Sequence, residues 1–470
     1  MTRSILLITV DCLRPDHISG YGYHRETTPN IDTLIARGTR LTRAYSNGPG
    51  TRFGFKALHA GTHPLRIKGA GLPRQAGDTL AEVLGDQGYQ TGGFSDNPFV
   101  SEYFNYHRGF DEFADYRQWT INDSRIPSLS VLNRFIRQQI GPSIPTGRIY
   151  EFFRAGFNSI VKWVEGQGAN VNSNDDIVVD NALEWISNAE ERTKPYFAWV
   201  HLMDAHHPYG YFPEHRKSLN IPSESKHVRM PSVEVGTSPP QEAIDAYDTN
   251  IKNADKQVGR LLEAIKNDVM IIVTADHGEE FGRHNQFHTE SVYQSMAHIP
   301  LIIDAVGFDN ETWDTPVSLL DVPATVARAG GANAPDYWDG EDLRAVTRDK
   351  DVFIGFENNE GVQSAVVRRN WKYVRLQDLL NSKPDSEQLF NIEMDPEEQN
   401  NQLESKDSLS RDLRERWEEF CREILDHRFQ AEHDLWDPQQ NPTETVNSYS
   451  EASVEHDETI DKRLEELGYK

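Results

Sequence analysis

Asp276 and His277 follow a short, apolar and largely β-branched run, residues 269–273, which predicts a buried strand. They place two metal-type ligands on the loop beyond the carboxyl end of that strand, the edge where open α/β sheets bind ligands. A carboxylate oxygen paired with an imidazole nitrogen suits Zn, Mn or Mg better than an all-oxygen calcium site. For this loop taken alone, a polar turn that only caps a core strand is an equal alternative.

A second loop of the same kind begins at Asp11, directly after residues 5–10, a continuous apolar run typical of a central parallel strand. Thr51 supplies a hydroxyl where a Gly/Pro loop enters a short helix that ends at Gly61. The helix dipole and the free backbone N–H groups favour an anion at that point. Thr is also a common helix N-cap, so a purely structural role for Thr51 stays open.

Two carboxylates, one imidazole and one hydroxyl from these loops could hold a divalent cation that lowers the pKa of the threonine and offsets charge on an ester oxygen. Other polar side chains at expected strand ends or nearby loops could transfer a proton to the leaving oxygen or hold an anionic group. These candidates are Asn97, Asp204, His206, His207, Arg52 and His288. The reaction class this implies is attack on a tetrahedral anionic ester.

The elements that must position these residues alternate between strands and helices. Strands are expected at residues 5–10, 39–45, 90–95, 196–202, 269–273 and 300–303. Helices are expected at 29–37, 79–88, 176–189, 241–265 and 319–329, besides the short helix that ends at Gly61. This alternation favours a large α/β sheet with helices on both faces. Short strands at 352–356, 364–367, 371–376 and 389–392 and a charged helix at 411–427 follow. We expect a catalytic α/β domain over residues 1–345, a C-terminal α+β subdomain over 346–428 and an acidic, loosely held tail over 429–470.

Residues 117–165 differ from the rest of the chain, with seven basic residues against three acidic ones and interleaved aromatic side chains. A helical insertion of this kind could hold an anionic substrate, form a dimer surface or contact a membrane surface. A helix pair packed on the main sheet is the plainer alternative. A homodimer is therefore one expectation for the assembly.

The whole chain of 470 residues carries a formal net charge of −26, with 74 acidic against 48 basic residues. This argues against a nucleic-acid partner, which needs a basic surface. Acidity spread along a globular chain is typical of a halophile's protein. Only two cysteines, and neither a signal peptide nor an apolar run of membrane-spanning length, predict a cytoplasmic protein.

Several segments resemble, in order, the signatures of the sulfatase family of the alkaline phosphatase superfamily. They are residues 6–17 (LLITVDCLRPDH), 28–32 (TPNID), 108–113 (RGFDEF), 204–209 (DAHHPY), 274–279 (TADHGE), 298–301 (HIPL), 389–396 (LFNIEMDP) and 464–469 (LEELGY). The resemblance runs almost end to end. It implies a large mixed sheet sandwiched by helices, alkaline phosphatase-like, with a small C-terminal antiparallel sheet and helix.

The resemblance also implies roles for single residues. Asp11, Asp276 and His277 match the family's metal ligands, and Thr51 stands at the place of the nucleophile. His206 and His288 match positions that contact the transferred group or protonate the leaving group, and Asn97 falls near substrate-binding positions. The two-metal spacing of Asp followed four residues later by His fails after Asp204, so we expect one metal ion.

The departures from the family pattern decide the expected chemistry. Sulfatases carry Cys or Ser, then Pro two and Arg four residues later, and convert the nucleophile to formylglycine; here Thr51, Phe53 and Phe55 stand there, and Thr cannot be converted. Cys12 replaces the usual second aspartate, and Asp276-His277 replaces Asp-Asn, which moves the preference from Ca toward Mn, Zn or Mg.

An unmodified threonine beside such a metal resembles the superfamily's phosphodiesterases and phosphotransferases, which form a phosphothreonine. We expect hydrolysis or transfer of phosphate mono- or diesters through Thr51. Sulfate ester hydrolysis without formylglycine and a non-catalytic, anion-binding relative are the alternatives. Sulfated or phosphorylated glycans, lipid head groups and small molecules all fit as substrates.

Overall fold

The computed structural model describes residues 3–115, 174–207, 209, 212–222, 241–265, 268–285, 290–358, 361–378, 385–425 and 428–431. The basic insertion expected at residues 117–165 and the candidate His288 lie outside the described residues. Among the described helices, none is long and apolar enough to cross a bilayer.

A mixed sheet occupies the centre of the molecule, and within the described residues it has nine strands in the order β10-β2-β8-β7-β1-β6-β4-β5, with β9 beside β2. The strands are β1 (Ser4–Val10), β2 (Thr39–Tyr45), β4 (Gln90–Ser95), β5 (Glu112–Ala114), β6 (Tyr196–Leu202), β7 (Val269–Thr274), β8 (His298–Asp304), β9 (Thr312–Trp313) and β10 (Val317–Ser318). Strands β7, β1, β6 and β4 are parallel neighbours. β8 is antiparallel to both β7 and β2, so β2 runs in the same direction as β1. The carboxyl ends of these five strands therefore meet at one edge.

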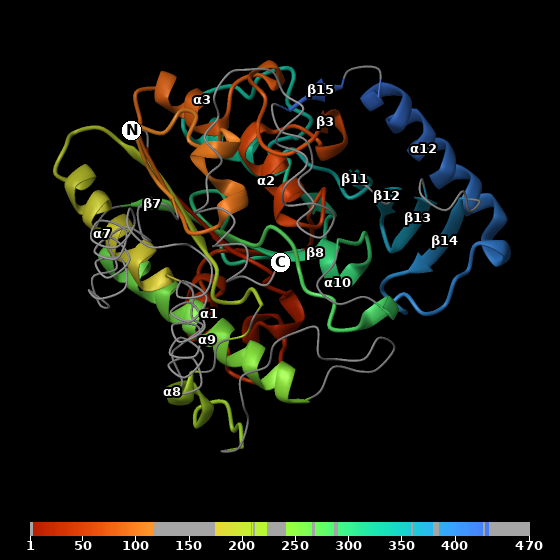
Figure 1. Ribbon diagram of the computed structural model, residues 1–470, viewed down its shortest axis with the longest axis horizontal. Coiled ribbons are helices and arrows are strands. Elements are labelled where there is room, and N and C mark those ends of the chain that lie inside the picture. The colour runs from red at the N-terminus through yellow and green to blue at the C-terminus, as the bar shows by residue number, and fades with distance from the viewer. Residues whose placement is uncertain are drawn as a thin grey trace, which may run out of the picture.

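Helices cover both faces of this sheet (Figure 1). α1 (Pro29–Ile35), α7 (Asp175–Glu190) and α9 (Gln241–Ala264) form one layer, and α2 (Thr51–Ala60), α3 (Leu80–Asp86) and α11 (Asp321–Ala329) form the other. The alternation along β6 shows how the layers divide, because successive side chains of a strand point to opposite faces. Tyr196 packs on Trp185 of α7 at 6.1 Å between ring centroids, whereas Trp199 packs on Phe55 of α2 at 5.5 Å.

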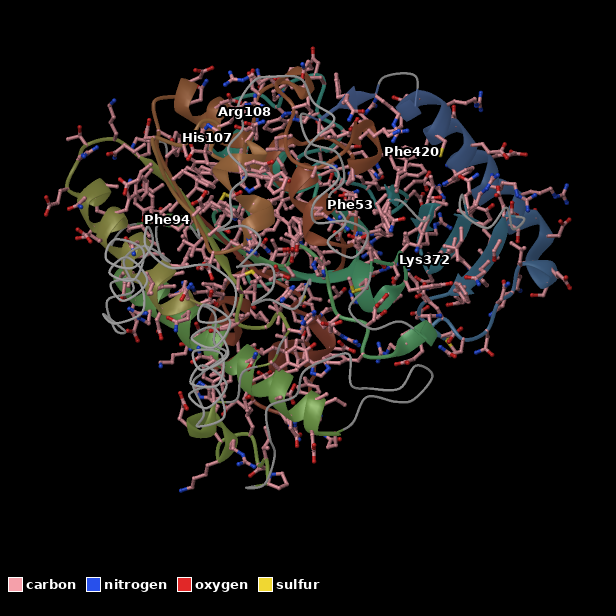
Figure 2. All side chains as sticks on the ribbon, viewed as in Figure 1. Phe53, Phe94, His107, Arg108, Lys372 and Phe420 are labelled. Atoms are coloured by element: carbon pink, nitrogen blue, oxygen red, sulfur yellow. The ribbon has the colours of Figure 1, made fainter. Side chains whose placement is uncertain are left out.

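The C-terminal subdomain is an antiparallel sheet of β11 (Asp351–Glu357), β12 (Gly361–Arg368), β13 (Trp371–Asp378) and β14 (Ser386–Asn391), covered by α12 (Asp407–Leu425). Phe420 of α12 stacks on Phe353, with ring centroids 4.0 Å apart. On the side of the large domain, Phe53 of α2 stacks on Phe356 at 5.0 Å. The buried Lys372 forms a 2.8 Å ion pair with Glu398. Figure 2 labels Phe53, Lys372 and Phe420 across this junction.

The remaining described α-helices and strands are α8 (Pro213–Arg216), α10 (Gln294–Ala297), β3 (Ile67–Lys68) and β15 (Phe429–Gln430), and short 3-10 helices occur between the elements. β15 pairs in parallel with β3, so the first residues of the expected loose tail form a strand beside residues 67–68. From residue 432 onward the tail lies outside the described residues. The predicted fold class, a large mixed sheet between helices with a small C-terminal antiparallel sheet and helix, is confirmed.

Candidate active site

Three of the predicted site residues meet at the carboxyl ends of β1 and β7. Asp11 directly follows β1, and Asp276 and His277 begin two residues after β7. Nε2 of His277 lies 3.5 Å from Oδ1 of Asp11 and 3.5 Å from Oδ2 of Asp276. All three side chains are buried. The parallel pairing of β1 with β7 is what brings together residues 265 positions apart in the chain.

Thr51 joins this group from α2, of which it is the first residue. The N-cap position belongs to Gly50, whose φ of 139° suits glycine, and the Thr51 hydroxyl does not cap the helix. Instead, Oγ1 lies 3.2 Å from Nε2 of His277 and 3.4 Å from Oδ2 of Asp11. The hydroxyl therefore faces the candidate metal ligands, and the purely structural N-cap role does not describe it.

The orientation of the His277 ring suits a metal ligand. Its Nδ1 lies 2.8 Å from the carbonyl oxygen of Gly278, so a proton on Nδ1 is donated there. The lone pair of Nε2 then points toward Asp11, Asp276 and Thr51. A hydrogen bond from one ring nitrogen commonly fixes the tautomer of a metal-binding histidine in this way.

The electrostatics of the group also favour a cation. Burial raises the pKa of Asp276 to about 6, and the negative charge of Asp11 acts in the same direction. Burial also opposes ionisation of Asp11, yet His206, His201 and His277 outweigh it and hold the pKa of Asp11 below its usual range. Oδ2 of Asp276 is buried and has no hydrogen-bond partner among the described residues. Asp11 and Asp276 with His201 form one group of three ligand atoms close enough to share a divalent cation, and Asp11 with Cys12 and His277 forms another.

His201 belongs to the same group, although the sequence did not single it out. It is the penultimate residue of β6, and its Nε2 lies 3.3 Å from Oδ2 of Asp11. Its Nδ1 lies 2.9 Å from Oγ1 of Thr9, which in turn accepts a hydrogen bond from Nε1 of Trp199 at 3.1 Å. Because Thr9 accepts from Trp199, its hydroxyl can donate to Nδ1 of His201. This arrangement favours the His201 tautomer with its proton on Nε2, next to Asp11. A histidine inside an otherwise apolar strand was the signal available in the sequence, and the structure adds its register with Thr9.

Asn97, a predicted substrate contact after β4, also reaches Asp11. Its Nδ2 donates to Oδ2 of Asp11 at 3.0 Å, and its Oδ1 accepts the backbone N–H of Phe99 at 2.9 Å. The amide thus orients one of the candidate metal ligands.

The loop after β6 carries His206 and His207, both buried, with ring centroids 4.9 Å apart. Nδ1 of His206 contacts the carbonyl oxygen of His207. In its protonated form, His206 lowers the pKa of Asp11 through its positive charge. His206 therefore interacts electrostatically with the group that contains Asp11.

Two further candidates have protein partners. The carboxylate of Asp204 accepts a 2.6 Å hydrogen bond from Nδ2 of Asn253 on α9. Arg52 forms an ion pair with Glu290, and its guanidinium also lies over the ring of Phe99 at 5.7 Å. Both side chains help to hold the loops around the site in place.

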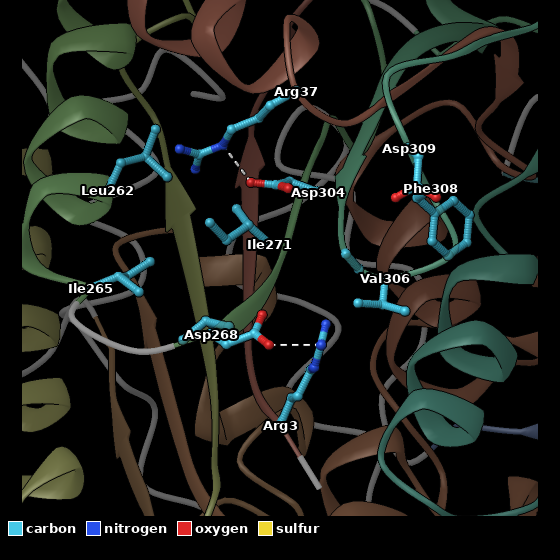
Figure 3. Close-up of a pocket in the computed structure, with 12 residues that line it drawn as sticks. Arg3, Arg37, Leu262, Ile265, Asp268, Ile271, Asp304, Val306, Phe308 and Asp309 are labelled. Atoms are coloured by element: carbon cyan, nitrogen blue, oxygen red, sulfur yellow. Dashed lines mark hydrogen bonds and ion pairs between the residues drawn. The ribbon is translucent and has the colours of Figure 1, made fainter. Parts of the chain in front are cut away.

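A surface cavity of about 460 Å³ lies at the opposite edge of the sheet, where β1 and β7 begin and β8 ends. Its two arginines are neutralised by ion pairs, Arg3 with Asp268 at 2.7 Å and Arg37 with Asp304 at 2.5 Å (Figure 3). The candidate active site shares no residue with this cavity.

The fold and the site together define a hydrolase of the alkaline phosphatase-like superfamily, with a cluster of side chains suited to a metal ion. The chain belongs to the sulfatase family, whose model matches residues 3–332. It is 22% identical over 453 residues to an arylsulfatase of Clostridium perfringens, a match that covers 87% of this chain and 91% of the relative. It is 29% identical over 174 residues to a choline-sulfatase of Rhizobium meliloti, covering 34% of this chain and 33% of the relative.

Solved structures share the fold. The phosphonate monoester hydrolase of Agrobacterium radiobacter matches with a TM-score of 0.65 at 18% identity, covering 91% of this chain and 96% of that one. The structure of Ps i-CgsB in complex with k-i-k-neocarrahexaose also matches with a TM-score of 0.65, at 20% identity, covering 92% and 95% of the two chains.

Proposed function

We propose that this sulfatase-family hydrolase cleaves phosphate mono- or diesters, or transfers their phosphoryl group, through a covalent intermediate on Thr51. The observation that carries the proposal is the position of an ordinary threonine hydroxyl, 3.2 Å from Nε2 of His277 and 3.4 Å from Oδ2 of Asp11. A threonine at this point can attack an ester directly, whereas it offers no route to a formylglycine.

Asp11, Asp276 and His277 would hold one divalent metal ion, with Thr51 beside it. When bound, the ion lowers the pKa of the hydroxyl and offsets charge on the ester oxygens. Nitrogen among the donors favours Zn, Mn or Mg over Ca. Asn97 and His201 hold Asp11 in place for this role.

In the first step, Oγ1 of Thr51 forms a bond to phosphorus while the bond from phosphorus to the leaving oxygen breaks. The hydroxyl proton goes to solvent, because the carboxylate of Asp11 would be bound to the metal ion, and His206 would supply a proton to the leaving oxygen. The positive end of the α2 helix dipole, beside Thr51, would stabilise the negative oxygens of the transferred group. Water, or an acceptor alcohol in a transferase, then cleaves the bond from Oγ1 to phosphorus and restores the hydroxyl.

Hydrolysis of sulfate esters by the unmodified threonine is the second candidate. The match to the arylsulfatase of Clostridium perfringens covers 91% of that relative, and this similarity favours sulfate ester hydrolysis. One structural neighbour was solved with D-glucosamine-2-N,6-O-disulfate as its substrate, and another, as its name states, hydrolyses phosphonate monoesters. A sulfated or phosphorylated glycan, a lipid head group or a small molecule is the proposed substrate class for this chain.

The test compares three aryl esters, a phosphate monoester, a phosphate diester and a sulfate, with metal-replete protein. We expect turnover of a phosphate ester that falls by at least about 1000-fold in Thr51→Ala, since a lost nucleophile removes the covalent route. Faster turnover of the sulfate would favour the second candidate. Unchanged activity in Thr51→Ala would refute the proposed intermediate, and metal binding without turnover of any ester would indicate a non-catalytic relative.

A further inference from the structure

Cys12 lies directly beside the candidate metal ligands but has no part in the mechanism above. It is fully buried, and its φ of 58° falls in the left-handed region that residues other than glycine seldom adopt. In this conformation its Sγ is 3.1 Å from Oδ1 of Asp11 and 3.9 Å from Nδ1 of His277. The sulfur atom is therefore directed into the group and not into the apolar core.

The donor atoms around Cys12 are spaced for one cation. A ligand atom each from Asp11, Cys12 and His277 lies within 4.8 Å of the other two, a separation compatible with a shared metal ion. Asp276 adds an independent observation, because its buried Oδ2 has no hydrogen-bond partner in the described part of the chain and lies 3.5 Å from Nε2 of His277.

The hydrogen bond of Cys12 places its sulfur atom against a candidate metal ligand, because the S–H group donates to Oδ1 of Asp11 at 3.1 Å. A cysteine that binds a divalent cation does so as the thiolate.

We propose that Cys12 is a metal ligand, so that the site is a mixed sulfur, nitrogen and oxygen site with Asp11, Asp276 and His277. The step is an exchange in which the S–H bond breaks, the proton goes to solvent and a bond from sulfur to the metal forms. A thiolate donor selects thiophilic metals, which favours zinc over magnesium, manganese or calcium. The inference rests on the proposed function only in requiring a metal at this place.

Binding of Co²⁺ to metal-free protein tests the proposal without any turnover. A cobalt thiolate gives a sulfur-to-metal charge-transfer band in the near ultraviolet. We expect this band in the wild type and in Cys421→Ser, the matched control at the other cysteine, and its loss in Cys12→Ser. We also expect Cys12→Ser to bind cobalt at least about tenfold more weakly, since even residues that only orient a ligand contribute that much.

Two further measurements cover a variant that folds poorly. Cys12→Asp restores an oxygen donor, and we expect it to reduce the preference for Zn²⁺ over Mg²⁺. In the unmodified protein, Zn²⁺ should protect Cys12 from alkylation under partly denaturing conditions while Cys421 still reacts. A cobalt complex that requires Asp276 but lacks the thiolate band, or a band that persists in Cys12→Ser, would overturn the proposal. Inactivity toward every ester together with an intact band would refute only the proposed function.

Discussion

Replacing Gly54 by alanine tests whether the contact between α2 and the Asp276 loop positions Thr51. Gly54 lies one helical turn after Thr51, and its backbone passes so close to the loop that an added Cβ would be 2.7 Å from the carbonyl oxygen of Asp276. The same atom would be 3.3 Å from Oγ of Ser46. Because the clashing atom is backbone, rotation of a side chain cannot relieve the contact.

The size of the effect follows from this distance. An ordinary van der Waals contact begins at 3.4 Å, so α2 and the loop must separate by about 0.7 Å. Inserting a methyl group into a packed interior costs about 1–3 kcal/mol of stability. A displacement of about 1 Å between reacting groups can cost about 100-fold in rate. We therefore expect kcat/KM to fall by roughly 10- to 100-fold while the protein still folds.

The assay pairs ester hydrolysis with thermal unfolding, and Gly85→Ala serves as the control. Gly85 is also a helical glycine, in α3, but a Cβ there meets no atom within 4 Å. Alanine at that exposed helical position should leave kcat/KM unchanged and raise stability by about 0.5–1 kcal/mol. Gly54→Ala with wild-type activity and stability would show that this contact does not position Thr51.

Three other outcomes follow from buried and surface charge. Burial lowers the pKa of His59 to about 3, so between about pH 3 and pH 6.5 the unfolded chain binds a proton that the folded protein does not. The free energy of unfolding should therefore fall as the pH drops through this range. In His59→Gln, the slope of the unfolding free energy against pH should be smaller by up to about 1.4 kcal/mol per pH unit. Unfolding free energies measured by chemical denaturation at several pH values would contradict this if they changed equally with pH in the wild type and in His59→Gln. Removing the metal with a chelator should lower the melting temperature, since a ligand at 100 times its Kd adds about 2.7 kcal/mol to the free energy of unfolding. In Asp276→Asn, the melting temperature should be the same with and without the chelator. With a net charge of −26, the protein should melt at a higher temperature in molar NaCl than at low salt, and a melting temperature independent of salt would remove the halophilic interpretation.

The sequence predicted the central strands well because both faces of the sheet are buried. β6 has the expected bounds, and β1 and β7 differ from them by a single residue. It also indicated that Asp11 and Asp276 lie at one edge, since parallel strands place their carboxyl ends together.

The position of a residue at a strand end does not tell in which direction its side chain points, so the sequence could not predict which candidates face the site. Asp204 follows a strand on that same edge, yet its carboxylate is bonded to Asn253 of α9, a partner that only the packed helix layer reveals. His201 lies within an apolar strand, and its proximity to Asp11 depends on the register between β6 and β1. Arg52 follows the candidate nucleophile, but its ion pair with Glu290 joins residues 238 positions apart.

Trapping the intermediate on Thr51 tests the central claim most directly. Metal-replete protein is mixed with an aryl phosphate ester, quenched in acid within one turnover and digested for mass spectrometry. We predict a phosphorylated peptide with the modification at Thr51, present in the wild type and absent in Thr51→Val. Steady hydrolysis with no covalent adduct at Thr51, or full activity in Thr51→Val, would contradict the account.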